Sequence, residues 1–208
     1  MNLLGHSFPF AGLFHRQAAT LATAAAQLES ILRDFTAVPD QCARISVLVS
    51  EGEKTSREIE RELSLTFIQS LYREDIRELN RAFQRTYQAI GAVSSRLGLY
   101  GFREAQKGAA AQAACMAEMT VEIAPLLEAF VREGDTAGRL ERARKLKREA
   151  DVFVLVGLGE IYEAAAGARA ENLLEALKWS QIYDRLEDAA SCLDHTVNVM
   201  EGIILKRV

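Results

Sequence analysis

Acidic side chains are the residues of this sequence whose types and spacing could do chemistry. Asp184 and Asp188 are four residues apart, so a helix would place both carboxylates on one face. Glu187 lies beside Asp188, and Glu51 is a further carboxylate earlier in the chain. Carboxylate oxygens are the ligands that hard divalent cations prefer. The same acids alternate with arginine and lysine, however, and from spacing alone a solvated helix face is the favoured interpretation.

A basic segment between Arg139 and Arg148 is the second candidate. It contains six basic residues, a density typical of an exposed helix stripe. The functional alternative is an anionic partner, namely a membrane surface, an acidic protein face or phosphate. The side chains expected to contact such a partner are Arg142, Arg144, Lys145 and Arg148.

Enzymatic chemistry finds no support in the sequence. The three histidines, His6, His15 and His195, are scattered and form no Cys–His or Ser–His–Asp arrangement, so His195 is interpreted as structural. The chain has neither a G-x-x-x-x-G-K-[ST] loop nor a G-x-G-x-x-G turn, which excludes nucleotide binding through these loops. Glu-x-x-His is absent as well, which excludes a ferritin-like oxidase. No catalytic residue and no cofactor are therefore predicted.

Composition limits the partners and the compartment. The 208 residues carry a net charge of −4, which argues against a nucleic-acid binder. Cys42, Cys115 and Cys192 are widely spaced, as expected for buried thiols in a reducing compartment. No window reaches about 18 uncharged apolar residues, so no membrane span is predicted. We expect a cytoplasmic protein.

Apolar residues recur at spacings of three and four along nearly the whole chain, which predicts helices with one apolar face each. Only 3 of the 208 residues are proline, which favours long uninterrupted helices. Asp40 is the predicted N-cap of the second helix, and Pro125 is expected to kink or break the fourth. The breaks between the six helices are predicted at Pro39-Asp40, near Ser70, at 97–101, at 134–136 and at 167–170.

These breaks give helices of about 25–35 residues, roughly 40–50 Å long at 1.5 Å per residue. Long helices with short connections pack as antiparallel bundles. The predicted fold is therefore all-α, with six helices in two antiparallel three-helix bundles. Residues 1–98 form the first bundle and residues 99–208 the second, with the alternative that both pack as one continuous domain.

Two segments carry a resemblance to a known family. Residues 73–79 read Arg-Glu-Asp-Ile-Arg-Glu-Leu, and residues 177–190 read Leu-Lys-Trp-Ser-Gln-Ile-Tyr-Asp-Arg-Leu-Glu-Asp-Ala-Ala. Together they resemble the PhoU-like phosphate transport regulators, in particular the small bacterial branch commonly encoded beside a low-affinity inorganic phosphate transporter. The six-helix division of nearly the whole chain agrees with the two three-helix bundles of that family.

The resemblance implies a non-enzymatic, cytoplasmic helical protein that works with a phosphate transporter at the inner face of the membrane. Some members of the family also work with a sensor kinase. Many bind metal clusters through an acid-x-x-x-Asp motif repeated on the inner helices of both bundles, since two carboxylates one turn apart on facing helices supply four ligands. An association between copies of the chain is left open.

This sequence departs from the metal motif at each of its four copies. Residues 51–55 end in Thr55, residues 84–88 have lost both acids, residues 147–151 begin with Lys147, and residues 187–191 end in Ser191. The acids that remain as a candidate site for iron or a divalent metal are Asp151, Glu187, Asp188 and Glu51.

Lys147 suggests a substitute for the metal. An ammonium one turn from Asp151 supplies a positive charge where a cation would otherwise lie, so we expect Lys147 to pair with Asp151 or Glu187. The favoured function is a regulator that partners an inorganic phosphate transporter. The alternatives are a metal-binding or metal-storage protein that uses the remaining acids of the second bundle, and a helical scaffold with no link to phosphate.

Overall fold

The computed structural model describes residues 9–67, 70–102, 104–130, 135–166 and 170–206, and they form six helices, as predicted. The helices are α1 (Pro9–Asp34), α2 (Val38–Leu65), α3 (Ser70–Tyr100), α4 (Lys107–Glu128), α5 (Thr136–Ala165) and α6 (Ala170–Leu205). The described residues contain no strand.

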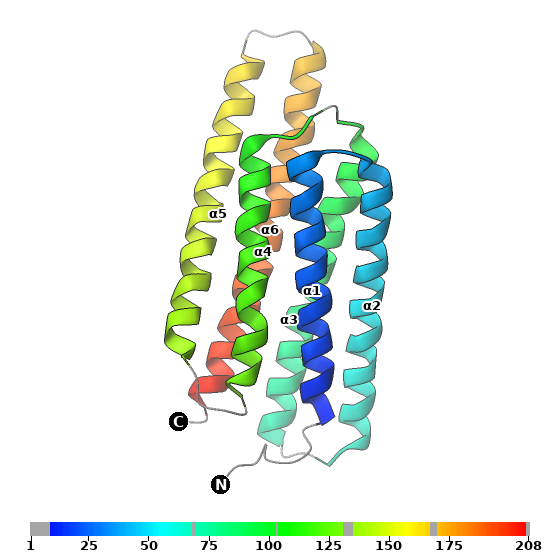
Figure 1. The fold of residues 1–208 in the computed structure, drawn as a ribbon, viewed down its shortest axis with the longest axis vertical. Helices are drawn as coiled ribbons and strands as arrows, with labels where there is room; N and C mark the ends of the chain where they lie inside the picture. The colour runs from blue at the N-terminus through cyan, green and yellow to red at the C-terminus, as the bar shows by residue number, and fades with distance from the viewer. Residues whose placement is uncertain (1–8, 68–69, 103, 131–134, 167–169, 207–208) are drawn as a thin grey trace.

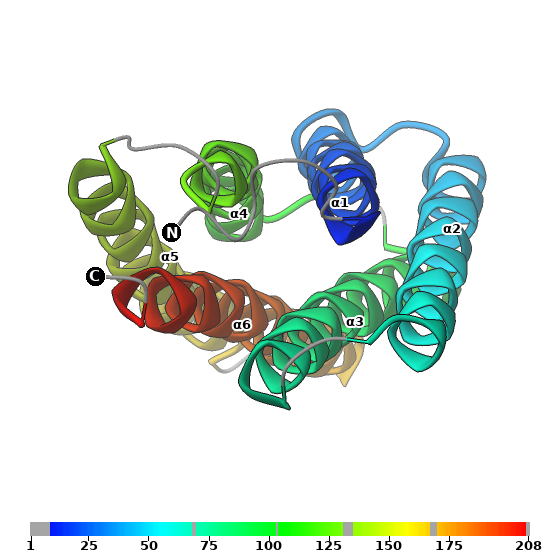
Figure 2. The same cartoon turned by 90° about the horizontal axis from the view of Figure 1, so that it is seen from below.

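The helices form two antiparallel three-helix halves, α1–α3 and α4–α6, that lie side by side (Figure 1). α1 packs against α4 and α3 packs against α6, and these two contacts join the halves. Seen from below, α1 and α4 form one layer and α3 and α6 the other, while α2 and α5 occupy the two lateral edges (Figure 2). The predicted division at residue 98 falls in the last turn of α3, and whether the halves fold as separate units stays a prediction.

Apolar side chains at helical spacing fill the interior, as the sequence pattern predicts. Phe14, Leu21 and Leu28 of α1 and Leu186 and Leu193 of α6 are all almost completely buried. Burying such side chains is the main force that holds the helices together.

A few buried polar contacts fix how the helices are aligned. Asn80 of α3 accepts a hydrogen bond from the Ser56 hydroxyl of α2 at 2.8 Å and donates to the carbonyl of Ser56 at 3.3 Å. The hydroxyls of Thr86 in α3 and Thr196 in α6 are 3.1 Å apart, across the contact between the halves. Buried polar groups need such partners, so these contacts favour one alignment over its neighbours.

One local prediction is wrong and another is wrong in part. α2 begins at Val38, with Ala37 in the N-cap position in a left-handed conformation (φ 46°), so Asp40 lies in the first turn and does not cap it. Pro39 explains the shift, because its fixed φ and missing N–H suit the first turn of a helix. α4 continues past Pro125 to Glu128, so the helix is not broken before this proline, and the alternative of a kink stays a prediction.

Candidate functional site

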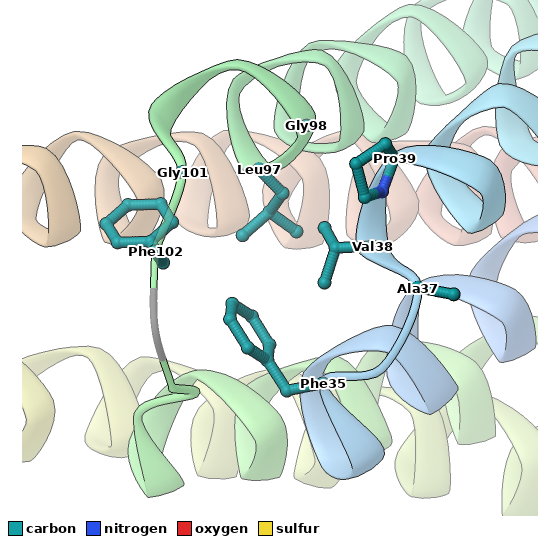
Figure 3. A pocket seen from close by; sticks show the side chains of 8 residues that line it. All are labelled: Phe35, Ala37, Val38, Pro39, Leu97, Gly98, Gly101 and Phe102. Atoms are coloured by element: carbon teal, nitrogen blue, oxygen red, sulfur yellow. The ribbon is translucent and has the colours of Figure 1, made fainter.

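A pocket of about 280 Å³ opens where the α1–α2 connection meets the α3–α4 connection. Phe35, Val38 and Leu97 point toward one another across it, and the Phe102 ring lies to one side (Figure 3). The remaining described lining residues are Ala37, Pro39, Gly98 and Gly101, so none of the described residues around this pocket has a charged or titratable side chain. The described lining therefore provides no acid, base or metal ligand.

In the first half of the molecule, an aromatic side chain is buried in the contact between α2 and α3. The Tyr87 ring of α3 lies against Gly52 of α2, so close that a Cβ at position 52 would overlap the ring. The Tyr87 hydroxyl donates to the Gln17 carbonyl of α1 at 2.6 Å. Burial raises the pKa of Tyr87 well above its usual range, and the nearby Glu51 carboxylate adds to the rise. Tyr87 is therefore a neutral, buried phenol that packs α3 against both α1 and α2.

In the second half, a second tyrosine is buried in the contact between α5 and α6. The Tyr183 ring of α6 lies against Gly157 of α5, and its hydroxyl approaches Gly108 at the start of α4. Burial raises the pKa of Tyr183 to about 12. Each half thus has a tyrosine of its third helix packed on a glycine of its second helix.

The remnant acids of the second half are dispersed. The ammonium of Lys147 lies 2.5 Å from the carboxylate of Asp151, as expected from the sequence. Asp188 is exposed and accepts a hydrogen bond from Arg185 at 2.7 Å, one turn away on α6. Glu187 is exposed on the same helix.

The four candidate acids do not come together in one group. Glu51 is exposed on α2 in the other half of the molecule, and across the described ranges no group of three or more His, Cys, Asp or Glu side chains is placed to hold a metal ion. Metal binding at these acids stays a prediction for metal analysis.

Reversing the charge of Lys147 tests whether its ammonium stands in for a cation. Lys147→Glu is expected to increase Mn²⁺ or Zn²⁺ binding, because it replaces the ammonium beside Asp151 with a second carboxylate one turn away. Titration calorimetry and elemental analysis of the purified protein measure this. The matched control is Lys147→Gln, which removes the ammonium without adding a carboxylate and should bind metal more weakly than Lys147→Glu. Stoichiometric iron or zinc in the purified wild-type protein would contradict the idea.

The basic segment lies in α5, and part of it holds α5 on its neighbours. Glu122 of α4 is 4% exposed, and its carboxylate oxygens lie 2.9 Å from Arg139 and 3.1 Å from Arg142. Arg144 lies 2.5 Å from Glu201 of α6, which raises its pKa. A buried carboxylate needs such cationic partners. Two of the four predicted partner contacts, Arg142 and Arg144, therefore already have partners within the molecule.

Lys145 and Arg148 differ from these two arginines. Both are well exposed, and both contact acids of α5 itself, with Lys145 3.7 Å from Glu149 and Arg148 2.8 Å from Glu141. Exposed pairs of this kind add little stability and exchange readily with other partners. Of the predicted basic contacts, these two are exposed and have no ion pair with another helix, whereas Arg142 is exposed but also paired with acids of α4.

The potential nucleophiles are poorly placed for chemistry. Cys42 and Cys115 are buried, Cys192 is half-buried, and burial raises the pKa of Cys115 to about 11, so little thiolate exists at neutral pH. His15 and His195 are exposed, so the structural role expected for His195 does not involve the core. His6 lies outside the described residues.

An exposed apolar surface on α5 and α6 is the feature that sequence reasoning missed. Both helices extend beyond the other four at one end of the molecule (Figure 1). Their exposed large apolar residues are Val152, Leu155, Val156 and Tyr162 on α5 and Leu173, Leu174 and Leu177 on α6. Contiguous apolar surface on a folded protein marks interaction sites. One feature of the sequence could have revealed this surface. In residues 152–158 every residue except Gly157 is apolar, so the apolar residues lie on all sides of the helix.

The architecture alone defines the class of protein, which is a helical bundle of two three-helix halves. The described residues contain no catalytic arrangement of side chains. Known structures place the bundle in the PhoU-like fold. A PhoU-like protein from Shewanella oneidensis MR-1 superposes with a TM-score of 0.76 at 12% identity, over 95% of this chain and all of the other. A second structure from that organism, a "putative PhoU-like phosphate regulatory protein", gives a TM-score of 0.73 at 11% identity, over 95% of this chain and 99% of the other.

One curated relative spans the whole chain. It is described as "Putative pit accessory protein" from Rhizobium meliloti (strain 1021) and is 24% identical over 211 residues, which is 100% of this chain and 97% of the relative. No family model matches the sequence. The resemblance to PhoU-like proteins seen in residues 73–79 and 177–190 is thus confirmed at the level of the fold.

Proposed function

We propose that this protein is a non-enzymatic accessory protein of a low-affinity inorganic phosphate transporter. The observation that carries the proposal is the relative described as a pit accessory protein, which matches this chain from end to end. Pit is a low-affinity phosphate transporter. The PhoU-like fold supports the same role, because one of the two structural neighbours is described as a phosphate regulatory protein.

The arrangement of side chains is consistent with a role in binding. In the described residues, the acids and bases singled out from the sequence either pair with one another within the molecule or lie exposed, and none of them lines the apolar pocket between the two connections. None of the described helices is long and apolar enough to cross a membrane. We infer a cytoplasmic protein that meets the transporter peripherally, at the inner face of the membrane.

A transport assay tests the proposal. Deleting the gene is expected to change the rate of labelled phosphate uptake by the low-affinity transporter, and expression of the full chain is expected to restore it. Tagged protein should also capture that transporter from detergent-solubilised membranes. The control is membranes from cells that lack the transporter. Unchanged uptake together with no recovered transporter would contradict the proposal.

A further inference from the structure

The two edge helices of the molecule present very different faces to solvent. α2 and α5 are the second helices of their halves and lie at opposite edges (Figure 2). The exposed face of α2 is mainly charged, with Lys54, Arg57 and Arg61 and two isolated apolar residues, Val47 and Leu65. α5 exposes four large apolar residues close together in the chain, Val152, Leu155, Val156 and Tyr162, which are 56%, 72%, 50% and 52% exposed. Because a solvated helix face needs no such apolar residues, the face of α5 is suited to a partner.

The outward residues of α5 follow a regular line, which we call the outer seam of α5. It consists of Lys145, Glu149, Val152, Val156, Gly159 and Glu163. The spacing alternates between four and three residues, which is the pattern of a helix that packs along a second helix. The two valines lie at the centre, a lysine at the N-terminal end and a glutamate at the C-terminal end.

We propose that the outer seam of α5 binds the outer seam of a second copy of this chain, antiparallel and across a two-fold axis. If Val152 faces Val156 of the second copy, the same alignment places Lys145 opposite Glu163 of that copy. By symmetry each contact occurs twice, so the seam is complementary to itself in charge as well as in apolar surface. A parallel arrangement would place Lys145 against its own copy and lose this complementarity.

The shape of the surface is compatible with binding a second copy of α5. A shallow groove lined by Lys145, Arg148, Glu149, Val152 and Phe153 lies on the N-terminal side of the apolar stretch, where the antiparallel alignment brings Val156 of the second copy. A standard interface buries roughly 800 Å² per partner, so the two valines of the seam need the exposed Leu155 and Tyr162 beside it and the flanking charged side chains to complete the contact. The inference concerns the assembly of the protein and does not depend on the proposed function.

Oligomeric state tests the proposal. Sedimentation or light scattering of the full chain should give a concentration-dependent dimer at twice the 23.0 kDa chain mass. Val152→Lys should weaken the dimer by about tenfold or more, because it puts a charge at the centre of the interface. The control is Val47→Lys on the exposed face of α2, where a valine of similar exposure, 58%, should be replaceable without effect. Thermal unfolding verifies that both variants fold.

Charge exchange tests the alignment itself. Lys145→Glu alone and Glu163→Lys alone should each weaken the dimer, because each puts like charges opposite one another, and the double exchange should restore it. A wild-type monomer at every concentration would overturn the proposal, and so would a dimer that Val152→Lys leaves intact or a double exchange without recovery. A monomer that co-sediments with anionic vesicles, and loses this with Val152→Lys, would assign the face to a membrane and overturn it too.

Discussion

Gly157→Ala is expected to lower the free energy of unfolding by about 2–3 kcal/mol, the upper part of the range for overpacking a filled interior. A Cβ at position 157 would overlap the Tyr183 ring, which is fully buried between α5 and the start of α4. Alanine normally stabilises a helix relative to glycine by about 1 kcal/mol, so the steric cost has to exceed this gain. Urea denaturation followed by circular dichroism measures the difference.

Two further variants make the result specific to this contact. Gly202→Ala, in α6, meets nothing within 4 Å and should be neutral or stabilising. Combining Gly157→Ala with Tyr183→Leu should recover part of the loss, because the smaller side chain leaves room for the methyl group. If Gly157→Ala raises stability as Gly202→Ala does, the ring does not lie on this glycine.

Trp179→Ala should cost about 3–5 kcal/mol, the range observed for truncating large buried aromatic residues. Trp179 of α6 is completely buried, with its ring 4.2 Å from that of Phe102 and 6.3 Å from that of Phe35. Phe35 follows α1 and Phe102 follows α3, so this one side chain holds both connections against α6 and supports the pocket between them.

The tryptophan also reports on its own surroundings. It is the only tryptophan in the chain, so the wild-type protein should show a single blue-shifted emission that moves to longer wavelength on unfolding. Leu177→Ala is the control, since Leu177 lies on the same helix but is 57% exposed and should change stability by no more than about 0.5 kcal/mol. Equal losses for both variants would contradict the packing described for Trp179.

Helix number and order were predictable because the apolar spacing is clean where one face of a helix is buried and the other solvated. α1 shows this, with Phe14, Leu21 and Leu28 all buried. The pattern fails in α5, where residues 152–156 are apolar on both sides of the helix, so spacing alone does not indicate which of them reach solvent. The exposed Leu155 could be assigned only when the packing of α4 and α6 was known.

The candidate site was predictable only over short sequence distances. Lys147 and Asp151 are one turn apart on one helix, so their contact followed from spacing. The partners of Arg142 and Arg144 could not be predicted in this way, because Glu122 and Glu201 belong to other helices. The buried positions of Tyr87 and Tyr183 were missed for the same reason, since each ring packs on a glycine of another helix.

The contacts of α1 with α4 and of α3 with α6 have a consequence for biosynthesis. As the ribosome releases the chain, the first three helices are complete before their counterparts exist, and the surfaces of α1 and α3 meant for α4 and α6 stay in contact with water. Thr86 then has no Thr196 to bond. A nascent chain paused at this stage would be prone to aggregate or to be held by a chaperone, until translation of the last hundred or so residues covers it.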